Sequence, residues 1–495
     1  MRLTIIGGGI AGLSAAYYAS ITNYYSRITL LESDSRWGGK IATDRIPFDG
    51  GHFIVEGGPD TFLATKPWGV ALCKELSLGE RLHGTNPHKK NTYVLHKGRL
   101  LPLPDGLAMM IPSDVPSILR SRLLSWTGKA RMGLDFLLPA RNVNGDESLG
   151  AFISRRLGRE AYENLIEPLM SGIYAGDGDR LSLASTFPYL RDLELKHGSL
   201  ARGALKMRQQ SNGKVQGSRS AFLTPTTGLA EIVEALVESL KSKADLRLNT
   251  RATHISRSDL RPSTFDIELE TGETLSTDAL ILATPAFISA QLLASFDPEL
   301  ASALQSIPYA STATVSLAYR LSDLPRELDG YGYVIPRREG RKALACTWTS
   351  TKFPHRAPEG YALIRVFIGR AGESPSPFGR GAGGEGTTPL PVGEGQGVRE
   401  KRGEGELLAI AKEELRLTLG ITAEPLLSRV FMWENAMPQY NLGHPELLRR
   451  IDAALEKYPS LALAGNSYRG IGIPDCIRSG EEATKRVCKL EGLKV

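Results

Sequence analysis

The feature that most constrains the fold is a glycine-rich turn near the start of the chain. The apolar run Arg2–Ile6 precedes the turn, and a run of small helix-forming residues, Ala11–Ala19, follows it. The turn itself carries Gly7, Gly9 and Gly12 in a GxGxxG pattern. The first glycine allows a tight turn, the second lets the backbone approach a pyrophosphate, and the third lets helix and strand pack closely. We therefore predict an α/β fold that opens with a dinucleotide-binding unit.

The next predicted strand ends on an acidic residue. Ile28–Leu31 is apolar and rich in branched side chains, and Glu32 follows it, 20 residues after Gly12. A carboxylate at this distance can accept hydrogen bonds from both ribose hydroxyls and would repel a 2′-phosphate. We predict that Glu32 binds the ribose of the dinucleotide; the alternative is a surface glutamate.

Two further glycine pairs favour FAD over NAD. Arg36–Lys40 (RWGGK) comes almost directly after Glu32. A second glycine pair so close to the ribose carboxylate indicates a longer dinucleotide, which needs a second stretch of backbone around it. The segment Glu56–Thr61 (EGGPDT) would then pass near the flavin ring.

The far end of the chain carries a related pattern. The apolar strand Leu461–Ala464 is followed by Gly465–Asp475 (GNSYRGIGIPD) and a helix from Cys476. We expect the glycines, Asn466 and the backbone at Ile471–Ile473 to approach the ribityl chain and the pyrimidine end of the flavin. A glycine-rich strand–turn–helix without a ligand is the alternative.

The remaining patterns divide the chain into three predicted domains. Helical signals separated by Gly/Pro turns dominate the middle of the chain, and residues near 310–370 alternate as antiparallel strands do. The predicted domains are a discontinuous FAD-binding domain over 1–84, 221–290 and 455–495, a helical insert over 85–220 that lines the substrate pocket, and a substrate-binding domain over 291–454.

One segment breaks every pattern of secondary structure. Residues 371–405 contain 11 glycines and 4 prolines in 35 positions. Such a composition buries too little apolar surface to fold, so we predict a flexible surface loop between a strand at 361–368 and a helix at 406–419. A binding tail is the alternative.

Composition excludes several classes of protein. Hydrophobic residues make up 41% of the chain, and the net charge of +6 is spread over 495 residues without a dense basic stripe, so we expect no nucleic-acid partner. The four cysteines form no CxxC pair and have no zinc spacing, so we expect no metal site and a reduced, cytoplasmic setting.

The chain shows no signal-peptide pattern and no apolar run of the ~20 residues that span a membrane. The stretch 100–112, which includes Leu107, Met109 and Met110, is either an interfacial surface or a packed loop or pocket wall. We therefore predict a cytoplasmic protein and keep open a peripheral contact with the inner face of the membrane.

Several segments together resemble one enzyme family over nearly the whole chain. Two of them are specific: Glu167–Asp177 (EPLMSGIYAGD) and Pro438–His444 (PQYNLGH). The others are Glu56–Leu63, Gly98–Pro104, Ser148–Gly150, Arg155–Gly158, Leu181–Pro188, Glu194, Gly198–Leu200, Trp433–Met437 and Gly465–Gly480. The chain resembles the protoporphyrinogen and coproporphyrinogen III oxidases, which belong to the flavoprotein amine oxidase superfamily. The resemblance implies a Rossmann-like FAD domain of the glutathione-reductase type, a mixed-sheet substrate domain and a helical insert.

The resemblance also implies site residues. FAD contacts are expected at Gly7, Gly8, Gly9, Ile10, Ala11, Gly12, Glu32, Gly39, Lys40, Gly58, Pro59, Asp60, Thr61, Ala252, Trp433, Asn466, Ile471, Gly472 and Ile473. Substrate contacts are expected at Gly172 and Tyr174 and, on a looser alignment, at Tyr331, Val334 and Phe367, for which core packing is the alternative. No histidine, cysteine or carboxylate pair in the motifs demands a general-base role, so we assign no catalytic residue; Tyr174 and Lys90 are candidates for orienting the substrate.

The activity that the resemblance implies is an FAD- and O₂-dependent oxidation in heme biosynthesis. It converts coproporphyrinogen III to coproporphyrin III, or protoporphyrinogen IX to protoporphyrin IX, and releases hydrogen peroxide. Lys89–Thr92 stands where the mitochondrial enzymes hold a substrate carboxylate with an arginine, which leaves the porphyrinogen open and slightly favours coproporphyrinogen III. Transient contacts with neighbouring heme-pathway enzymes or a membrane surface are further expectations. The alternatives are an oxidase of amines or carotenoids, and a flavin-binding protein without enzymatic activity.

Overall fold

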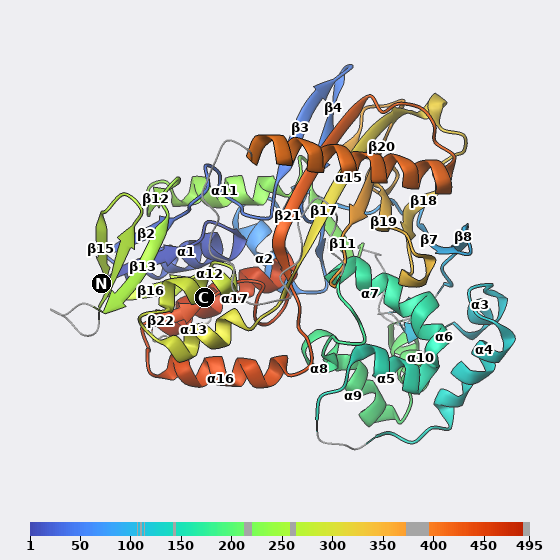
Figure 1. Cartoon of the computed structure of the whole chain (residues 1–495), viewed down its shortest axis with the longest axis horizontal. Coiled ribbons are helices and arrows are strands. Elements are labelled where there is room, and N and C mark those ends of the chain that lie inside the picture. Colours follow the sequence, from blue (N-terminus) through green and yellow to red (C-terminus); the bar gives the residue numbers. More distant parts are fainter. Residues whose placement is uncertain are drawn as a thin grey trace.

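The computed structural model describes residues 1–105, 107–108, 111–112, 114–141, 145–211, 220–257, 264–372 and 396–488. Figure 1 shows two sheets, each with helices against it, and a separate group of helices. The predicted α/β class with a Rossmann-like sheet, a mixed sheet and a helical group is confirmed. The division into domains at particular residues stays our proposal.

The first sheet has five strands in the order β12-β2-β1-β16-β22, and every neighbouring pair is parallel. Its strands come from both ends and the middle of the chain. The inner strand β16 and its neighbour β22 are entirely apolar, because both faces of the sheet are covered. The strands are β1 (Arg2–Ile6), β2 (Arg27–Leu31), β12 (Asp245–Arg247), β16 (Ala279–Leu282) and β22 (Leu461–Leu463).

Alternate side chains of these strands enter two different cores. Leu3 and Ile5 pack with α1 (Ile10–Thr22), α2 (Pro67–Glu75), α11 (Ala230–Leu240) and α17 (Ile473–Cys488). Ile6 and the other alternate residues pack with a layer on the opposite face. That layer consists of the antiparallel strands β13 (Ala252–Arg257), β14 (Phe265–Leu269) and β15 (Thr274–Thr277) and of α12 (Ala286–Leu293), α13 (Pro298–Gln305) and α16 (His444–Glu456).

The second sheet has seven strands in the order β21-β17-β20-β19-β18-β7-β8 and is mixed, because only β18 and β7 run parallel. α15 (Gln396–Leu419) covers one face. The strands are β7 (Asn91–His96), β8 (Arg99–Pro102), β17 (Tyr309–Arg320), β18 (Gly330–Val334), β19 (Ala343–Trp348), β20 (Tyr361–Ile368) and β21 (Leu427–Pro438), and the short α14 (Thr349–Lys352) follows β19.

The smaller strands form separate sheets of two or three strands. β3 (Thr43–Phe48) and β4 (Gly51–Glu56) form a hairpin. β5 (Phe62–Leu63), β11 (Phe222–Pro225) and β6 (Leu82–Gly84) form a three-stranded sheet, and β9 (Leu107–Ala108) pairs with β10 (Ile111–Pro112).

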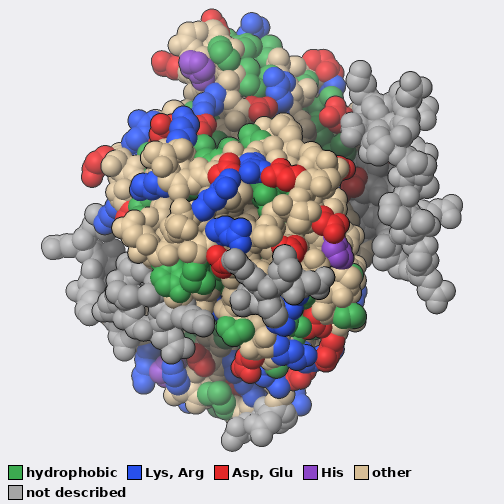
Figure 2. All heavy atoms as spheres, turned by 90° about the vertical axis from the view of Figure 1, so that its left-hand side faces the viewer, with side chains coloured by type: hydrophobic (Ala, Val, Ile, Leu, Met, Phe, Trp, Pro, Cys, Tyr) green, Lys and Arg blue, Asp and Glu red, His purple; other side chains and the backbone are tan. Residues whose placement is uncertain are grey.

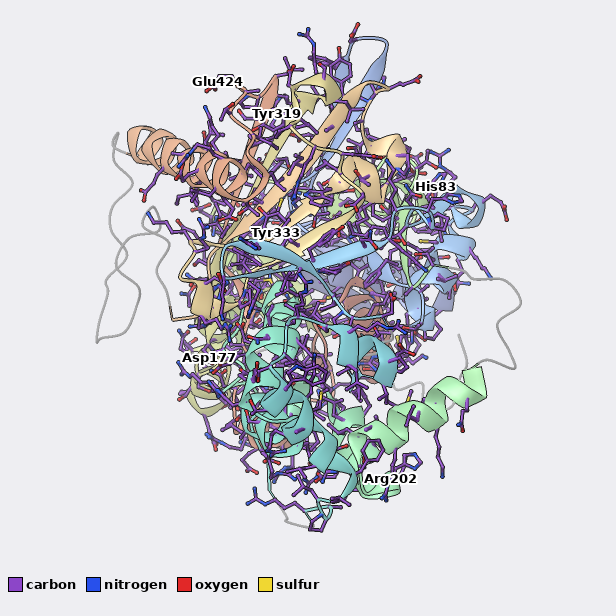
Figure 3. All side chains as sticks on the ribbon, turned by 90° about the vertical axis from the view of Figure 1, so that its right-hand side faces the viewer. His83, Asp177, Arg202, Tyr319, Tyr333 and Glu424 are labelled. Carbon is purple, nitrogen blue, oxygen red and sulfur yellow. The ribbon has the colours of Figure 1, made fainter. Side chains whose placement is uncertain are left out.

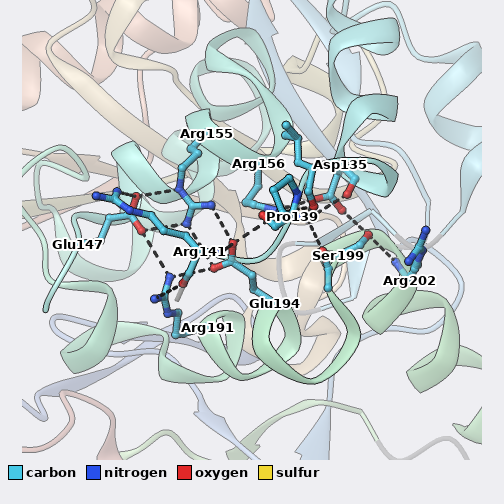
Figure 4. A network of polar contacts seen from close by, with 12 residues as sticks. Asp135, Pro139, Arg141, Glu147, Arg155, Arg156, Arg191, Glu194, Ser199 and Arg202 are labelled. Atoms are coloured by element: carbon cyan, nitrogen blue, oxygen red, sulfur yellow. Dashed lines mark hydrogen bonds and ion pairs between the residues drawn. The ribbon is translucent and has the colours of Figure 1, made fainter. Parts of the chain in front are cut away.

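The helical group lies below the second sheet, as Figure 3 shows with Tyr333 on the sheet and Asp177 and Arg202 on the helical group. It comprises α3 (Val115–Arg120), α4 (Trp126–Gly133), α5 (Leu149–Leu157), α6 (Arg159–Ala161), a π-helical turn (Tyr162–Ile166), α7 (Glu167–Tyr174), α8 (Leu183–Thr186), α9 (Pro188–His197) and α10 (Leu200–Ser211). A buried network of charged side chains joins α5, α9 and the segment around Asp135 (Figure 4).

Two predictions about elements are wrong in part. Residues 91–102, predicted to lie in the helical insert, form β7 and β8, because β7 pairs with β18 and so completes the second sheet. α15 begins at Gln396, ten residues before the predicted start, so the predicted loop does not extend to residue 405. The rest of that predicted loop, 373–395, lies outside the described residues, as do Met109 and Met110 of the predicted interfacial stretch.

The surface gives no single-sign face in the view of Figure 2, where acidic and basic side chains are interspersed. Among the described residues, no helix combines the length and the apolar character that crossing a membrane requires.

Candidate functional site

The three glycines of the first turn have different surroundings. Gly7 adopts φ +110°, which favours glycine, and a Cβ there would press against the carbonyl of Ala283. A Cβ at Gly12 would overlap the carbonyl oxygen of Gly7. Gly9 has no atom within 4 Å of the position that its Cβ would take. Gly7 and Gly12 are thus enclosed by the protein's own backbone, whereas Gly9 is open at the end of the helix where N–H groups are free.

The remaining N-terminal site residues surround this turn. The backbone N–H of Gly8 donates to Oε2 of Glu32 at 2.6 Å, so the carboxylate lies beside the turn. Gly38 pairs with Gly9, and its N–H donates to the carbonyl of Gly8 at 2.8 Å. The glycine pair Gly38–Gly39 is therefore adjacent to the first glycine turn. Ile10 and Ala11 are the first two residues of α1.

Ala252 has the weakest link to this cluster. It lies at the start of β13 and packs against the core of the outer layer. The N–H of Thr250, two residues earlier, donates to the carbonyl of Glu32 at 2.8 Å. The strand therefore starts close to the ribose-binding residue that we predict, although no contact of Ala252 itself joins the cluster.

Lys40 joins the two ends of the chain. Its Nζ donates to the carbonyl of Ala436 and lies 3.5 Å from Oδ1 of Asn466. Burial lowers the pKa of Lys40 to about 8. The predicted sites at residues 39–40 and at residue 466 are 426 positions apart in sequence and adjacent in the fold.

The segment Gly57–Thr61 lies between the first glycine turn and the second sheet. A Cβ at Gly58 would overlap the carbonyl oxygen of Lys40. Nε1 of Trp433, on β21, donates to the carbonyl of Gly57 at 2.9 Å. The carboxylate of Asp60 pairs with Nζ of Lys352 at 3.0 Å. Burial by itself would raise the pKa of Asp60, but Lys352 and then Arg365 outweigh it and hold the pKa at about 2.

The C-terminal turn is held by a residue from the second specific motif. The hydroxyl of Tyr440 donates to the carbonyl of Asn466 at 2.7 Å and accepts from the N–H of Gly470 at 2.9 Å. Its ring stacks on His444 with centroids 4.3 Å apart. After this turn, Ile471 packs against the helical group, and Gly472 and Ile473 lead into α17.

Three of the five predicted substrate residues come together. Tyr174 ends α7, is buried, and packs edge-on against Phe187 and Tyr440. Val334 and Phe367 are partly buried and pack around Ala175, the residue after Tyr174. This cluster places the predicted substrate wall next to the C-terminal turn.

The other two predicted substrate residues lie apart. The hydroxyl of Tyr331 donates to the carbonyl of Asn86 at 2.8 Å and to Oγ1 of Thr85 at 3.0 Å, away from the cluster. Gly172 is exposed, with no atom within 4 Å of its Cβ position.

Sequence reasoning missed the polar side chains that hold Gly57 and Gly58 against the second sheet, chiefly Arg365 and Thr314. Arg365 is buried on β20, and its Nη2 donates to the carbonyls of Gly57, at 2.9 Å, and Gly58. The signal was present, because Arg365 is the one charged residue in the otherwise apolar run Tyr361–Ile368. Arginine is rarely buried unless its charge or its donors have partners, so this residue indicates a specific interaction.

A known protein family matches almost the whole chain. The model described as flavin containing amine oxidoreductase matches residues 10–488. The chain belongs to that family. Its members are flavin-containing oxidoreductases, and the clusters around Gly9, Lys40 and Gly58 present the open backbone and the glycines that a flavin nucleotide needs.

Named relatives match over almost the full length. A coproporphyrinogen III oxidase of Bacillus subtilis is 38% identical and covers 97% of both chains. One of Staphylococcus aureus is 34% identical and covers 98% of both. A solved structure from an Exiguobacterium species, named as a candidate protoporphyrinogen oxidase, has a TM-score of 0.82 at 33% identity and covers 99% of this chain and 98% of its own. The predicted resemblance to the porphyrinogen oxidases is confirmed.

Proposed function

We propose that this protein binds FAD and oxidises coproporphyrinogen III to coproporphyrin III, with O₂ as the electron acceptor and hydrogen peroxide as the second product. The observation that carries the proposal is the link between two predicted sites. Tyr174, in the predicted substrate wall, packs on Tyr440, whose hydroxyl bonds the backbone of the predicted flavin turn at Asn466 and Gly470. A substrate against this wall would lie close to the flavin.

The residues present fit FAD rather than a shorter flavin. The open Cα face of Gly9 at the start of α1 suits a pyrophosphate, and Glu32 beside it suits the ribose of the adenosine half. Gly58 and Asn466 would hold the flavin half, because both contact Lys40 at the other side of the turn.

When bound, FAD would supply the two-electron redox chemistry, with a meso carbon of the porphyrinogen as the hydride donor. The chain's own task is to orient a large, flexible macrocycle in an apolar setting. Val334 and Phe367 supply apolar surface. Burial raises the pKa of the Tyr174 phenol, so this hydroxyl stays protonated near neutral pH and does not serve as a base there.

The choice of coproporphyrinogen III follows from the relatives that carry this name and from the lysines at residues 89–90. Lys89 pairs with Glu327 at 2.6 Å on an exposed surface. A fixed arginine is absent from Lys89–Thr92, so we expect the propionates to be held differently from those in the mitochondrial enzymes.

An amine oxidase would need aromatic residues that stand open around the flavin. Tyr440, before the C-terminal turn, and Tyr468, within it, are the aromatic residues that could contribute to such a cage. Both are buried, and the Tyr440 ring is stacked on His444 with its hydroxyl engaged by backbone. Neither ring is available to an amine, which favours the porphyrinogen.

The proposal is tested with purified protein reconstituted with FAD. Coproporphyrinogen III, protoporphyrinogen IX and an aliphatic amine are supplied in parallel under air, and porphyrin fluorescence and hydrogen peroxide are followed. We expect the highest kcat/KM with coproporphyrinogen III and no peroxide with the amine. Protein that binds no flavin, or that releases peroxide only with the amine, contradicts the proposal.

We also propose a transient contact with a membrane surface or with a neighbouring enzyme of the heme pathway. Trp126 and Leu137 are 74% and 79% exposed on the helical group, with Lys129 4.4 Å from the Trp126 ring. Sedimentation with anionic lipid vesicles tests whether these exposed side chains contact a membrane.

A further inference from the structure

Arg365 occupies an unusual place on the second sheet. Residues 363, 365 and 367 point to the face of β20 opposite α15. Leu363 packs with Phe53 and Phe367 packs with Ala175, so the face is apolar on both sides of the arginine. Arg365 is 2% exposed. Such burial of a guanidinium is costly unless its charge and donors are used.

Part of the side chain holds the backbone of the predicted flavin segment. Nη2 of Arg365 donates to the carbonyls of Gly57 and Gly58. The Gly57 carbonyl also accepts from Oγ1 of Thr314 at 2.8 Å and from Nε1 of Trp433 at 2.9 Å. Donors from three neighbouring strands, β17, β20 and β21, therefore meet at one peptide group and fix it to the sheet.

The charge of Arg365 has no counter-charge in direct contact among the residues described. The two nearby carboxylates have partners of their own: Glu56 pairs with Arg356 at 2.8 Å, and Asp60 pairs with Lys352 at 3.0 Å. Nε and Nη1 of Arg365 are buried without a hydrogen-bond partner, and its Cζ lies 4.6 Å from the centroid of the Phe367 ring. The group thus contains two carboxylates, Glu56 and Asp60, and the three cations Lys352, Arg356 and Arg365, so its net charge is one positive charge.

We propose that Arg365 is a positioning residue that raises the reduction potential of the flavin, by keeping an uncompensated positive charge directly behind the Gly57–Gly58 peptide. The inference rests on the flavin site proposed above. Reduction brings two electrons from the substrate into this region, and a fixed cation in an environment of low dielectric stabilises the added negative charge. The hydride donor and O₂ of the proposed reaction supply and remove these electrons, so no further reactant is needed.

A purely structural role is the competing explanation, because the guanidinium also clamps a peptide. Three variants separate the two roles. Arg365→Met removes charge and clamp, and Arg365→Lys keeps the charge. Thr314→Val removes a neutral donor from the same Gly57 carbonyl and is the matched control for the clamp.

The readout is the midpoint potential of the bound flavin, measured by anaerobic titration against reference dyes, together with flavin content. For Arg365→Met we expect the equilibrium constant of two-electron reduction to fall about tenfold, a shift of ~30 mV to lower potential. Arg365→Lys and Thr314→Val should keep the wild-type potential within about 10 mV, a third of that shift. An unchanged potential in Arg365→Met, or an equal fall in Thr314→Val, overturns the proposal.

If Arg365→Met does not fold, Arg365→Gln replaces it, because glutamine keeps an amide donor but carries no charge. We expect the same fall in midpoint potential for Arg365→Gln, and an unchanged potential would again overturn the proposal. The result also separates this inference from the proposed function. Wild-type protein without flavin or without porphyrinogen oxidation refutes the proposed function. If the wild type binds flavin and is active, but Arg365→Gln has the same flavin midpoint potential as the wild type, only the proposed role of Arg365 is refuted.

Discussion

At the scale of single residues, the three glycines of the first turn separate folding from ligand binding. The Cα of Gly12 faces the carbonyl of Gly7, so any side chain there collides with the backbone. The Cα of Gly9 faces open space, and its φ of −71° suits any residue. The same motif thus contains one position that only the fold restricts and one that only a ligand would restrict.

We therefore expect Gly9→Ala to fold with a melting temperature close to that of the wild-type apoprotein, and to bind FAD at least tenfold more weakly, because a methyl group would stand where the pyrophosphate approaches. Gly12→Ala should lower the stability of the apoprotein itself by at least ~2 kcal/mol. Thermal unfolding without flavin and FAD titration check both. Equal flavin affinity in Gly9→Ala and wild type would contradict the assignment of the turn.

A partly buried histidine makes stability depend on pH. Burial, then Arg356 and His83, lower the pKa of His355 from 6.5 to about 4. The His83 and His355 rings lie with centroids 4.7 Å apart, and Nε2 of His355 is buried without a hydrogen-bond partner. Between pH 6.5 and 4 the unfolded chain binds the proton and the folded chain does not, so stability falls as the pH falls through this range.

For this group we expect wild-type protein to lose about 1–2 kcal/mol more than His355→Phe when the pH is lowered from 6.5 to about 4, after allowance for the partial exposure of the ring. Urea unfolding of both proteins at the two pH values measures the difference. Parallel pH profiles of the two proteins would show that the histidine does not titrate in this way.

At the scale of elements, the helical group is joined by charges as well as by apolar packing. Arg156 on α5 is completely buried and bonds the carboxylate of Asp135 at 2.6 Å and the carbonyl of Gly198 at 2.9 Å (Figure 4). Oδ2 of Asp135 also accepts from the hydroxyl of Ser199 at 2.6 Å. The network joins α5 to the residues just before α10. It therefore holds α5 in place, and α7 follows α5 along the chain after α6 and the π-helical turn.

Removal of Arg156 leaves a buried carboxylate without its partner. We expect Arg156→Met to lower the free energy of unfolding by about 3–5 kcal/mol. Arg159 is the matched control, because it pairs with Glu163 at 2.7 Å and Asp179 at 3.0 Å while more than half exposed, and Arg159→Met should cost less than ~1 kcal/mol. Denaturant unfolding measures both, and equal costs would mean that the buried network contributes no more than surface pairs.

At the scale of the whole molecule, the two ends of the chain form one site. α1 and α17 pack side by side, and Oγ1 of Thr484 donates to the carbonyl of Ala15 at 3.0 Å. A Cβ at Gly480 would overlap the carbonyl oxygen of Ala11, so the two helices approach at backbone distance. A ligand that contacts both ends therefore stabilises the entire first sheet.

Flavin binding should accordingly protect both ends together. At FAD concentrations of about 100 times Kd we expect a gain of ~2.7 kcal/mol in the free energy of unfolding. Amide hydrogen exchange should slow at residues 7–12 and at residues 465–473 in the same titration. Gly9→Ala at equal FAD concentration is the control, and protection confined to one of the two segments would contradict a shared site.

Much of this architecture was predictable from local patterns. The strand, glycine turn and helix at the start of the chain, the acidic end of β2 and the strand β20 follow from short-range periodicity and backbone sterics, which neighbouring residues determine. The glycines at residues 7 and 12 are explained by close backbone approaches that the first motif anticipated. The family follows from the same motifs.

Only the tertiary structure decided which distant residues meet. Lys40 and Asn466, Tyr174 and Tyr440, and Arg365 and Gly57 are joined by packing between elements that are hundreds of residues apart in sequence. The assignment of residues 91–102 to the second sheet depended on pairing with β18, which no local pattern encodes. Sequence therefore determined the elements and the kind of nucleotide site, whereas long-range pairing and the burial of charge determined the environment of that site.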